Sequence, residues 1–164
     1  MTDTRVALID GFYAAFARRD AEAMATCYAE NVRFSDPVFA ELRGQDAGDM
    51  WRMLCERAND LEITHSGVRM DGDRGQADWV ARYTFSGTGR PVVNRVHATF
   101  HLEGDKIVDH RDDFDMWAWT RMALGVPGVL LGWSGMLQRK VGKQAMGRLR
   151  AWQAEKPGGK PDAA

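Results

Sequence analysis

The chain of 164 residues is 45% hydrophobic and 27% charged with a formal net charge of −1, which fits one globular domain and excludes a general attraction to nucleic acid. The charge is unevenly distributed, because residues 1–114 carry 14 Lys and Arg against 20 Asp and Glu, whereas residues 115–164 carry 8 against 3. The body is therefore acidic and the C-terminal part is basic.

Two helices are predicted first. Apolar residues recur at helical spacing over residues 4–18, which predicts an amphipathic helix. Asp20 is suited to cap a second, shorter helix. That helix is predicted to run through Tyr28 and to end near residues 30–31.

A hairpin and a third helix follow. Residues 32–36 alternate apolar and polar side chains up to Pro37, and residues 38–42 are predicted to form a short return strand. Asp46 is then predicted to cap a third helix, whose apolar residues form one stripe.

Helical periodicity stops after this helix, and four strand-like runs follow. They cover residues 61–70, 76–85, 92–102 and 106–115 and are separated by short turns rich in Asp and Gly. Such short connections predict antiparallel neighbours, because a parallel crossover needs a dozen or more residues. The result is a meander that faces three helices, an α+β layout.

The C-terminal part is predicted to be helical over residues 116–124 and again over about 129–152. The second of these helices has an apolar stripe with basic residues mostly outside it, so it needs an apolar partner. Packing on the domain is favoured over a second subunit or a membrane surface. The predicted organisation is a body of residues 1–118, a helical extension of residues 119–154 and a flexible tail of residues 155–164.

Other features bear on cellular location and on cysteine chemistry. Charged residues interrupt the apolar residues of the N-terminal segment 1–16, whereas a signal peptide has an uninterrupted apolar core. A cytoplasmic location is therefore expected. The longest apolar stretch, residues 126–137, contains Pro127 and is shorter than the roughly 20 residues of a membrane span. Cys27 and Cys55 fall on predicted helices and are interpreted as small buried residues without a chemical role.

The most informative segment is the last predicted strand, within residues 104–115. Alternate residues of a strand face opposite sides, so Val108, His110, Asp112 and Phe114 share one face. A face that combines apolar side chains with an imidazole and a carboxylate is typical of a strand that lines a ligand cavity.

The chain resembles the SnoaL-like, nuclear transport factor 2-like superfamily over about residues 4–118, through its three helices, the hairpin sequence YAENVRFSDP and the strand sequence GDKIVDHRDDFD. The resemblance implies a cone-shaped, strongly curved and mostly antiparallel sheet wrapped on the N-terminal helices, to which the C-terminal amphipathic helix is added. It also implies a cavity covered by helices. The superfamily includes ketosteroid isomerases, polyketide cyclases, limonene epoxide hydrolases, dehydratases and domains that catalyse nothing, so the fold does not name the reaction.

The resemblance assigns Asp36 to the position of the proton-shuttling aspartate of ketosteroid isomerases. Phe12 falls where those isomerases hold their oxyanion tyrosine, and Ala98 falls near the position of their protonated acid. Both oxyanion donors are replaced, which removes a large electrostatic stabilisation of charge on the substrate oxygen. Authentic steroid isomerisation is therefore not expected.

Residues 110–115 are similar to the Trp-Arg-Asp-Tyr-Phe-Asp segment of limonene epoxide hydrolases, which places Asp112 on one of their catalytic aspartates. The other residues of that mechanism are not matched. Their positions fall on Ala81, Tyr83, Phe34 and Asp36. An epoxide hydrolase of that design is not expected either.

The candidate site residues follow from the strand phases that the resemblance implies. The predicted catalytic residues are Asp36 as the preferred base, Asp112 and His110 as a second acid/base group or its orienter, and Tyr83 as a hydrogen-bond donor. The predicted pocket-lining residues are Phe12, Phe34, Trp79, Ala81, Phe85, Val96, Ala98, Phe100 and Phe114. A carboxyl group in such an apolar cavity has a raised pKa, whereas a protonated imidazole nearby lowers it, and either case suits proton transfer.

Structural alternatives stay open for these residues. Asp36 can be a turn residue that accepts local backbone hydrogen bonds. Asp112 can be half of a structural ion pair with a neighbouring arginine or with His110. His97 and His101 predict no metal site, because residues four apart in a strand are separated by roughly 13 Å, and they fall on the opposite, convex face.

Two functions are predicted. The first is a cofactor-independent isomerase, dehydratase or cyclase that moves protons on a small apolar carbonyl or hydroxyl compound. The alternative is a noncatalytic domain that binds a hydrophobic ligand or dimerises. The expected partners are a small apolar ligand and a second copy of the chain in a homodimer, and neither nucleic acid nor a cofactor is required. Contact of the C-terminal helix with a membrane surface is a third, less favoured prediction.

Overall fold

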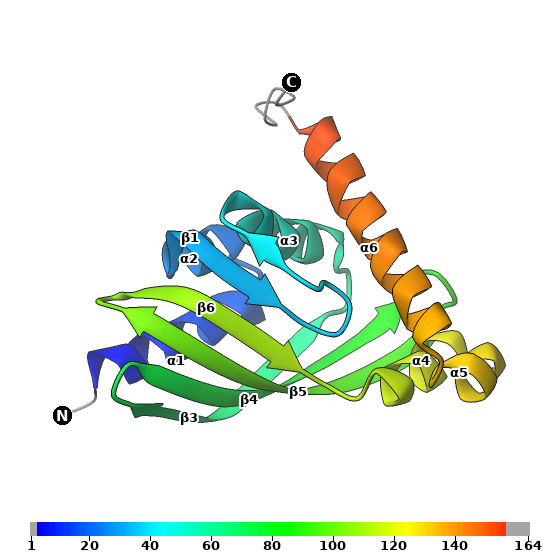
Figure 1. Cartoon of the computed structure of the whole chain (residues 1–164), viewed down its shortest axis with the longest axis horizontal. Helices are drawn as coiled ribbons and strands as arrows, with labels where there is room; N and C mark the ends of the chain where they lie inside the picture. Colours follow the sequence, from blue (N-terminus) through cyan, green and yellow to red (C-terminus); the bar gives the residue numbers. More distant parts are fainter. Residues whose placement is uncertain (1–2, 157–164) are drawn as a thin grey trace.

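The computed structural model describes residues 3–156 and folds them into one curved sheet, with helices against its inner face and a helical C-terminal extension (Figure 1). The N-terminal helices are α1 (Thr4–Ala17), α2 (Ala21–Thr26) and α3 (Gln45–Arg57). The strands are β1 (Tyr28–Ser35), β2 (Leu42–Arg43), β3 (Glu62–Asp71), β4 (Arg74–Phe85), β5 (Arg90–Glu103) and β6 (Lys106–Asp113). The C-terminal helices are α4 (Met116–Leu124), α5 (Val126–Leu131) and α6 (Gly135–Glu155). Most of the predicted tail, residues 157–164, lies outside the described residues.

The sheet has six strands in the order β2-β1-β6-β5-β4-β3. Strands β3 to β6 form the predicted antiparallel meander, and β4 and β5 pair over their whole length. Strand β1 pairs with β6 in parallel, so the chain returns beside its first strand only after the meander is complete. The predicted α+β class and the mostly antiparallel, curved sheet are confirmed.

Two predicted element boundaries in the N-terminal part are wrong. Helix α2 ends at Thr26, and Tyr28 begins β1, because this segment pairs with β6 and buries one apolar side chain after another on its inner face. The return strand is reduced to β2, since the carboxylate of Asp36 accepts hydrogen bonds from the backbone of Val38 and Phe39 and holds both residues in a turn.

Two helix starts also differ from the prediction. Helix α3 begins after Gly44, which has a φ of 54°, and the Asp46 carboxylate binds the side chain of Arg150 instead of capping the helix. The helix predicted over residues 129–152 is divided into α5 and α6. The division occurs because Ser134 starts a new helix, where its hydroxyl accepts a hydrogen bond from the backbone N–H of Leu137.

The core between the sheet and the N-terminal helices is aromatic. Phe12 and Phe16 of α1, Trp51 of α3 and Trp79 of β4 are buried against one another, with ring centroids about 5–6.5 Å apart in mostly edge-to-face contacts. Cys27 and Cys55 are free and buried, and burial raises the pKa of the Cys55 thiol to about 11. A second, smaller cluster around Val92 and Trp119 lies under α4.

Helix α6 packs its C-terminal half on this core. Leu149 is fully buried, and the Trp152 indole N–H donates to the carboxylate of Glu56 in α3 at 3.1 Å. Arg150 of the same half forms an ion pair with Asp46 at 2.8 Å. None of the described helices is long and apolar enough to span a membrane.

Helix α5 approaches α4 through two glycines. A Cβ atom at Gly128 would overlap the carbonyl oxygen of Thr120, and one at Gly132 would overlap its hydroxyl. We therefore expect Gly128→Ala to lower the free energy of unfolding by about 1–3 kcal/mol, because the α4–α5 contact has to open. Urea unfolding measures this change.

The control is Gly147→Ala in α6, where an added Cβ meets nothing within 4 Å. This change should raise the free energy of unfolding by about 0.5–1 kcal/mol, because alanine loses less backbone freedom in a helix. Equal stability of the two alanine variants would contradict the close contact between α4 and α5.

Candidate functional site

Strand β6 presents two different faces. His110 and Asp112 point to the interior and are 0% and 3% exposed, whereas Asp109 and Arg111 point to the outer face of the sheet. Opposite them on β5, Phe100 pairs with His110, and Ala98 pairs with Asp112. The structure therefore places His110 and Asp112 on the same face of β6, as the sequence predicts.

The imidazole of His110 lies at the centre of a buried chain of hydrogen bonds. Its Nε2 is 2.9 Å from Oδ1 of Asp112, and its Nδ1 is 2.7 Å from the Tyr28 hydroxyl. The Trp51 indole N–H donates to the Tyr28 hydroxyl oxygen at 2.8 Å, and the Trp79 indole N–H donates to Asp112 Oδ1 at 3.3 Å. We call these five side chains the interior relay.

The hydrogen bonds of the interior relay are consistent with one assignment of donors and acceptors. Burial raises the pKa of Tyr28 well above its usual 10.0, so its hydroxyl keeps the proton and can donate it to His110 Nδ1. Nε2 then carries the ring proton and donates to the carboxylate of Asp112. Both ring nitrogens of His110, the Tyr28 hydroxyl and the two indole N–H groups therefore have partners, which is what a stable network in an apolar core requires.

Aromatic rings enclose this network. Trp51 stacks on the His110 ring with centroids 6.1 Å apart, and Phe12, Phe34 and Phe100 contact it at 5.5, 5.0 and 4.4 Å. This packing fixes the orientation of the imidazole and excludes water from it. The site as it stands is closed on the side of His110.

Asp36 lies at the end of β1, in the loop that leads to β2. Its Oδ1 accepts hydrogen bonds from the backbone N–H groups of Val38 at 2.7 Å and Phe39 at 2.6 Å. Burial nevertheless raises the pKa of Asp36 to about 7, and the negative charge of Asp112 adds to this rise, while the two backbone hydrogen bonds oppose it. Asp36 is half-buried, and its two hydrogen bonds are those of the turn residue that the sequence offers as one alternative.

Tyr83 is separate from the interior relay. It is half-buried in β4 beside the cluster under α4, and its hydroxyl oxygen accepts a hydrogen bond from the Trp119 indole N–H at 2.8 Å. Burial raises its pKa. The structure therefore places Tyr83 beside the cluster under α4, whereas it brings His110 and Asp112 together, and the charge of Asp112 contributes to the raised pKa of Asp36.

The predicted pocket-lining residues divide between buried and half-buried positions. The buried ones are Phe12, Phe34, Trp79, Ala81, Val96, Ala98 and Phe100, all in the main core. Phe85 and Phe114 are half-buried beside α4.

Tyr28 and Trp51 were not among the predicted site residues. Tyr28 was missed because the sequence predicts its segment as the end of a helix. In the structure Tyr28, Val32 and Phe34 occupy even positions of β1 and are all buried. Trp51 carried no signal in the sequence, since an aromatic residue on an amphipathic helix is ordinarily a core residue.

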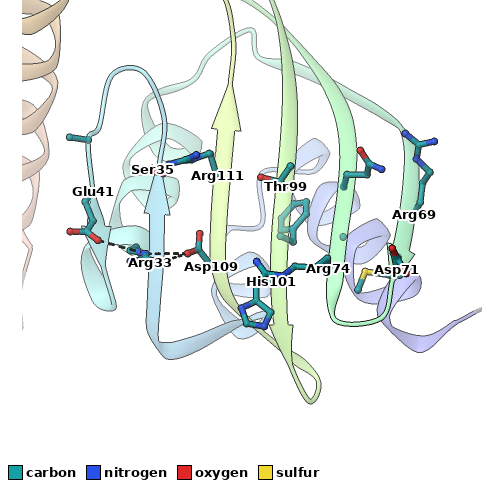
Figure 2. A pocket seen from close by; sticks show the side chains of 15 residues that line it. Arg33, Ser35, Glu41, Arg69, Asp71, Arg74, Thr99, His101, Asp109 and Arg111 are labelled. Atoms are coloured by element: carbon teal, nitrogen blue, oxygen red, sulfur yellow. Dashed lines mark hydrogen bonds and ion pairs between the residues drawn. The ribbon is translucent and has the colours of Figure 1, made fainter.

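A groove of about 810 Å³ lies on the other face of the sheet (Figure 2). Its lining residues on β1 and β6 alternate with the residues that face the interior. They include Arg33, Ser35, Thr99, His101, Asp109 and Arg111. Arg33 is held by Asp109 at 2.5 Å and by Glu41 at 3.7 Å. Among the predicted site residues, only Phe100 borders this groove.

Histidines of the outer face pair with single carboxylates. His97 Nδ1 lies 2.7 Å from Asp78, and His101 Nε2 lies 3.1 Å from Asp73. Within residues 3–156 the structure gathers no group of three His, Cys, Asp or Glu side chains that could hold a metal ion.

Comparisons with known proteins agree with this architecture. A sequence model described as the SnoaL-like domain matches residues 9–110. An NTF2-like protein of unknown function from Burkholderia pseudomallei has a TM-score of 0.65 at 19% identity, over 74% of this chain and 98% of that chain. An LEH-like epoxide hydrolase from M. tuberculosis has a TM-score of 0.64 at 16% identity, over 78% and 96%.

A putative polyketide cyclase from Xanthomonas campestris pv. campestris has a TM-score of 0.58 at 20% identity, over 73% of this chain and 96% of that chain. At such identities the likeness shows the fold alone. No curated protein sequence matches the chain.

Proposed function

This chain belongs to the SnoaL-like domain family, and we propose that it binds a small, largely apolar carbonyl or hydroxyl compound beside Asp36 and moves a proton on it. The observation that carries the proposal is the half-buried Asp36 at the end of β1, whose pKa is raised by burial and by the negative charge of the buried Asp112. Isomerisation, dehydration and cyclisation all begin or end with such a proton transfer.

Asp36 is the proposed base. A general base works best when its pKa lies near the working pH, and the pKa of Asp36 is raised to about 7. Its two hydrogen bonds both end on Oδ1, which leaves Oδ2 as the oxygen for a substrate proton. Val38 in the same loop packs against α6 beside Gly142, so the C-terminal extension covers the loop that carries the base.

Asp112 is the proposed second group. Its hydrogen bonds from His110 and Trp79 both end on Oδ1, so the proposal again assigns the ligand to Oδ2. The interior relay behind Asp112 fixes the carboxyl group in one orientation, as a catalytic constellation requires. His110 and Tyr28 are therefore positioning residues in this proposal.

A noncatalytic role is the second candidate, and one observation favours it. His110 and Asp112 are almost without solvent exposure, and aromatic rings occupy the space around them. In that case the interior is a structural core, and the domain binds a hydrophobic ligand or a second copy of the chain elsewhere. Both candidates allow the domain to bind a small apolar ligand, but only the first predicts proton exchange on that ligand.

The test measures exchange of carbon-bound protons for deuterium in a panel of apolar cyclic ketones, followed by NMR in D₂O. We expect exchange catalysed by the wild type to rise with pH through about 7 and to fall by a factor of about 10²–10⁴ in Asp36→Asn. Asp109→Asn on the outer face is the matched control and should keep the wild-type rate.

Two results together would contradict the catalytic proposal. One is the absence of exchange above the buffer rate with every ketone. The other is a titration of the Asp36 carboxyl carbon, followed by ¹³C NMR, near the ordinary 3.8. Ketone binding without exchange would instead support the noncatalytic candidate.

A further inference from the structure

Helix α5 and the start of α6 expose an unusual number of large apolar side chains. We call this set the apolar tip; it consists of Val126, Val129, Leu130, Leu131, Trp133 and Met136. Val126, Trp133 and Met136 are 71%, 69% and 75% exposed. Single exposed apolar residues are normal on a protein surface, but six within eleven consecutive positions form a patch that needs a partner.

The apolar tip arises because α5 turns its glycines toward the protein and its apolar side chains toward solvent, whereas an ordinary surface helix buries its apolar side chains. Its contact with α4 uses Gly128 and Gly132, where the backbones come so close that no side chain fits. The apolar side chains of α5 therefore point away from the protein. The sequence predicts Leu130 and Trp133 as part of one apolar helical stripe that packs on the domain, but the break before Ser134 separates both residues from the buried half of α6.

The chain segment that contains the apolar tip carries charge of one sign. Between Asp115 and Glu155 the chain has no acidic residue and carries six arginines and lysines. Arg139, Lys140 and Lys143 are exposed on the first turns of α6 directly after the tip. On α4 the guanidinium of Arg121 lies 4.3 Å above the ring of Trp117, which is itself 41% exposed.

The position of the apolar tip suits contact with a large flat partner. Figure 1 shows α4 and α5 at the end of the molecule remote from the N-terminus, with α6 running back from them. A standard protein interface needs about 20–30 residues on each side, which is more than this small projecting end provides. Insertion into a lipid interface needs only a few apolar and aromatic side chains with basic residues beside them.

We propose that the apolar tip inserts into the interface of a membrane that contains anionic lipids. Trp133 and the neighbouring leucines enter the boundary between headgroups and acyl chains, and Arg139, Lys140 and Lys143 contact the lipid phosphates. The acidic body of the protein, residues 1–114, then faces away from the negatively charged surface.

The experiment is sedimentation of the full chain with vesicles. One set is pure phosphatidylcholine, and the other contains about a third phosphatidylglycerol as the anionic lipid. We expect binding to the anionic vesicles, on the order of a hundredfold weaker binding to the neutral ones because the contributions of three basic residues multiply, and a decrease with added salt. Leu130→Ser combined with Trp133→Ser should lower the affinity at least about tenfold.

Two further variants separate the contributions. Arg139→Gln and Lys140→Gln should each lower the affinity for anionic vesicles about fivefold and leave binding to neutral vesicles unchanged. Leu54→Ser is the matched control, because Leu54 is 40% exposed on α3, outside the tip, and this variant should bind as the wild type does.

Two outcomes would overturn the proposal. One is a wild-type protein that sediments with neither vesicle, or that binds equally well with and without Leu130 and Trp133. The other is a wild-type dimer in analytical ultracentrifugation that becomes a monomer in the double variant, which would make the apolar tip a contact between two copies of the chain.

Discussion

Replacing Asp36 with Asn should stabilise the folded protein at pH 8, and by less at pH 5. The folded-state pKa of Asp36 is about 7 against an ordinary 3.8, so the folded state binds more protons than the unfolded state between these values. Stability contributed by this group therefore falls as the pH rises from about 4 to 7. Asn carries no charge and avoids the loss, which amounts to about 4 kcal/mol as an upper bound at pH 8.

Urea unfolding of both proteins at pH 5 and pH 8 measures this difference. The side-chain oxygen of Asn can still accept the two hydrogen bonds from Val38 and Phe39, so the turn is preserved. Asp109→Asn serves as the control for the loss of a carboxylate on the outer face. A stability difference that is the same at both pH values would show that the Asp36 carboxyl is not displaced from its ordinary acidity.

Tyr28→Phe should lower the free energy of unfolding by about 2–4 kcal/mol. The change removes one hydroxyl and leaves both the Trp51 indole N–H and His110 Nδ1 without their hydrogen-bond partner in an apolar surrounding. Each buried group left in this way costs about 1–3 kcal/mol. The loss of volume is negligible, so the effect reports the interior relay itself.

Tyr13→Phe provides a matched control in the same core. Tyr13 is fully buried beside Phe12, and its hydroxyl has no hydrogen-bond partner within residues 3–156. Removal of this hydroxyl should raise the free energy of unfolding by about 1 kcal/mol, because an unpaired buried polar group is lost. Chemical unfolding at neutral pH compares the two variants, and a loss of similar size in both would mean that the relay contributes nothing beyond burial.

Local patterns in the sequence predict much of this fold. The helix over residues 116–124 is found at the predicted positions, and the four strands of the meander lie within two residues of their predicted bounds. The apolar residues of these elements recur with a clear helical or strand spacing, and turns rich in Asp and Gly separate the strands. The division at Ser134 was missed, because an apolar residue every three or four positions continues across it and does not reveal that Gly128 and Gly132 direct α5 against α4.

Only the part of the candidate site that depends on local sequence could be predicted. The shared face of His110 and Asp112 follows from the alternation of one strand, which a sequence shows directly. The hydrogen bond between Tyr28 and His110 does not, because it depends on parallel pairing of β1 with a strand far along the chain. Asp36 is intermediate: its turn bonds are local and follow from the Asp-Pro sequence, but its raised pKa depends on burial by distant elements.

The parallel pairing of β1 with β6 sets the order in which the protein can assemble. Tyr28 and His110 are 82 positions apart, so the first strand emerges during synthesis long before its neighbour exists. Until then the edge of β1 that pairs with β6 is unpaired and the Tyr28 hydroxyl lacks its partner His110, and a nascent chain in that state is open to pairing with other chains. Because the entropy of closing this loop is lost before the contacts between β1 and β6 form, we expect formation of the sheet centre to be a late step in folding.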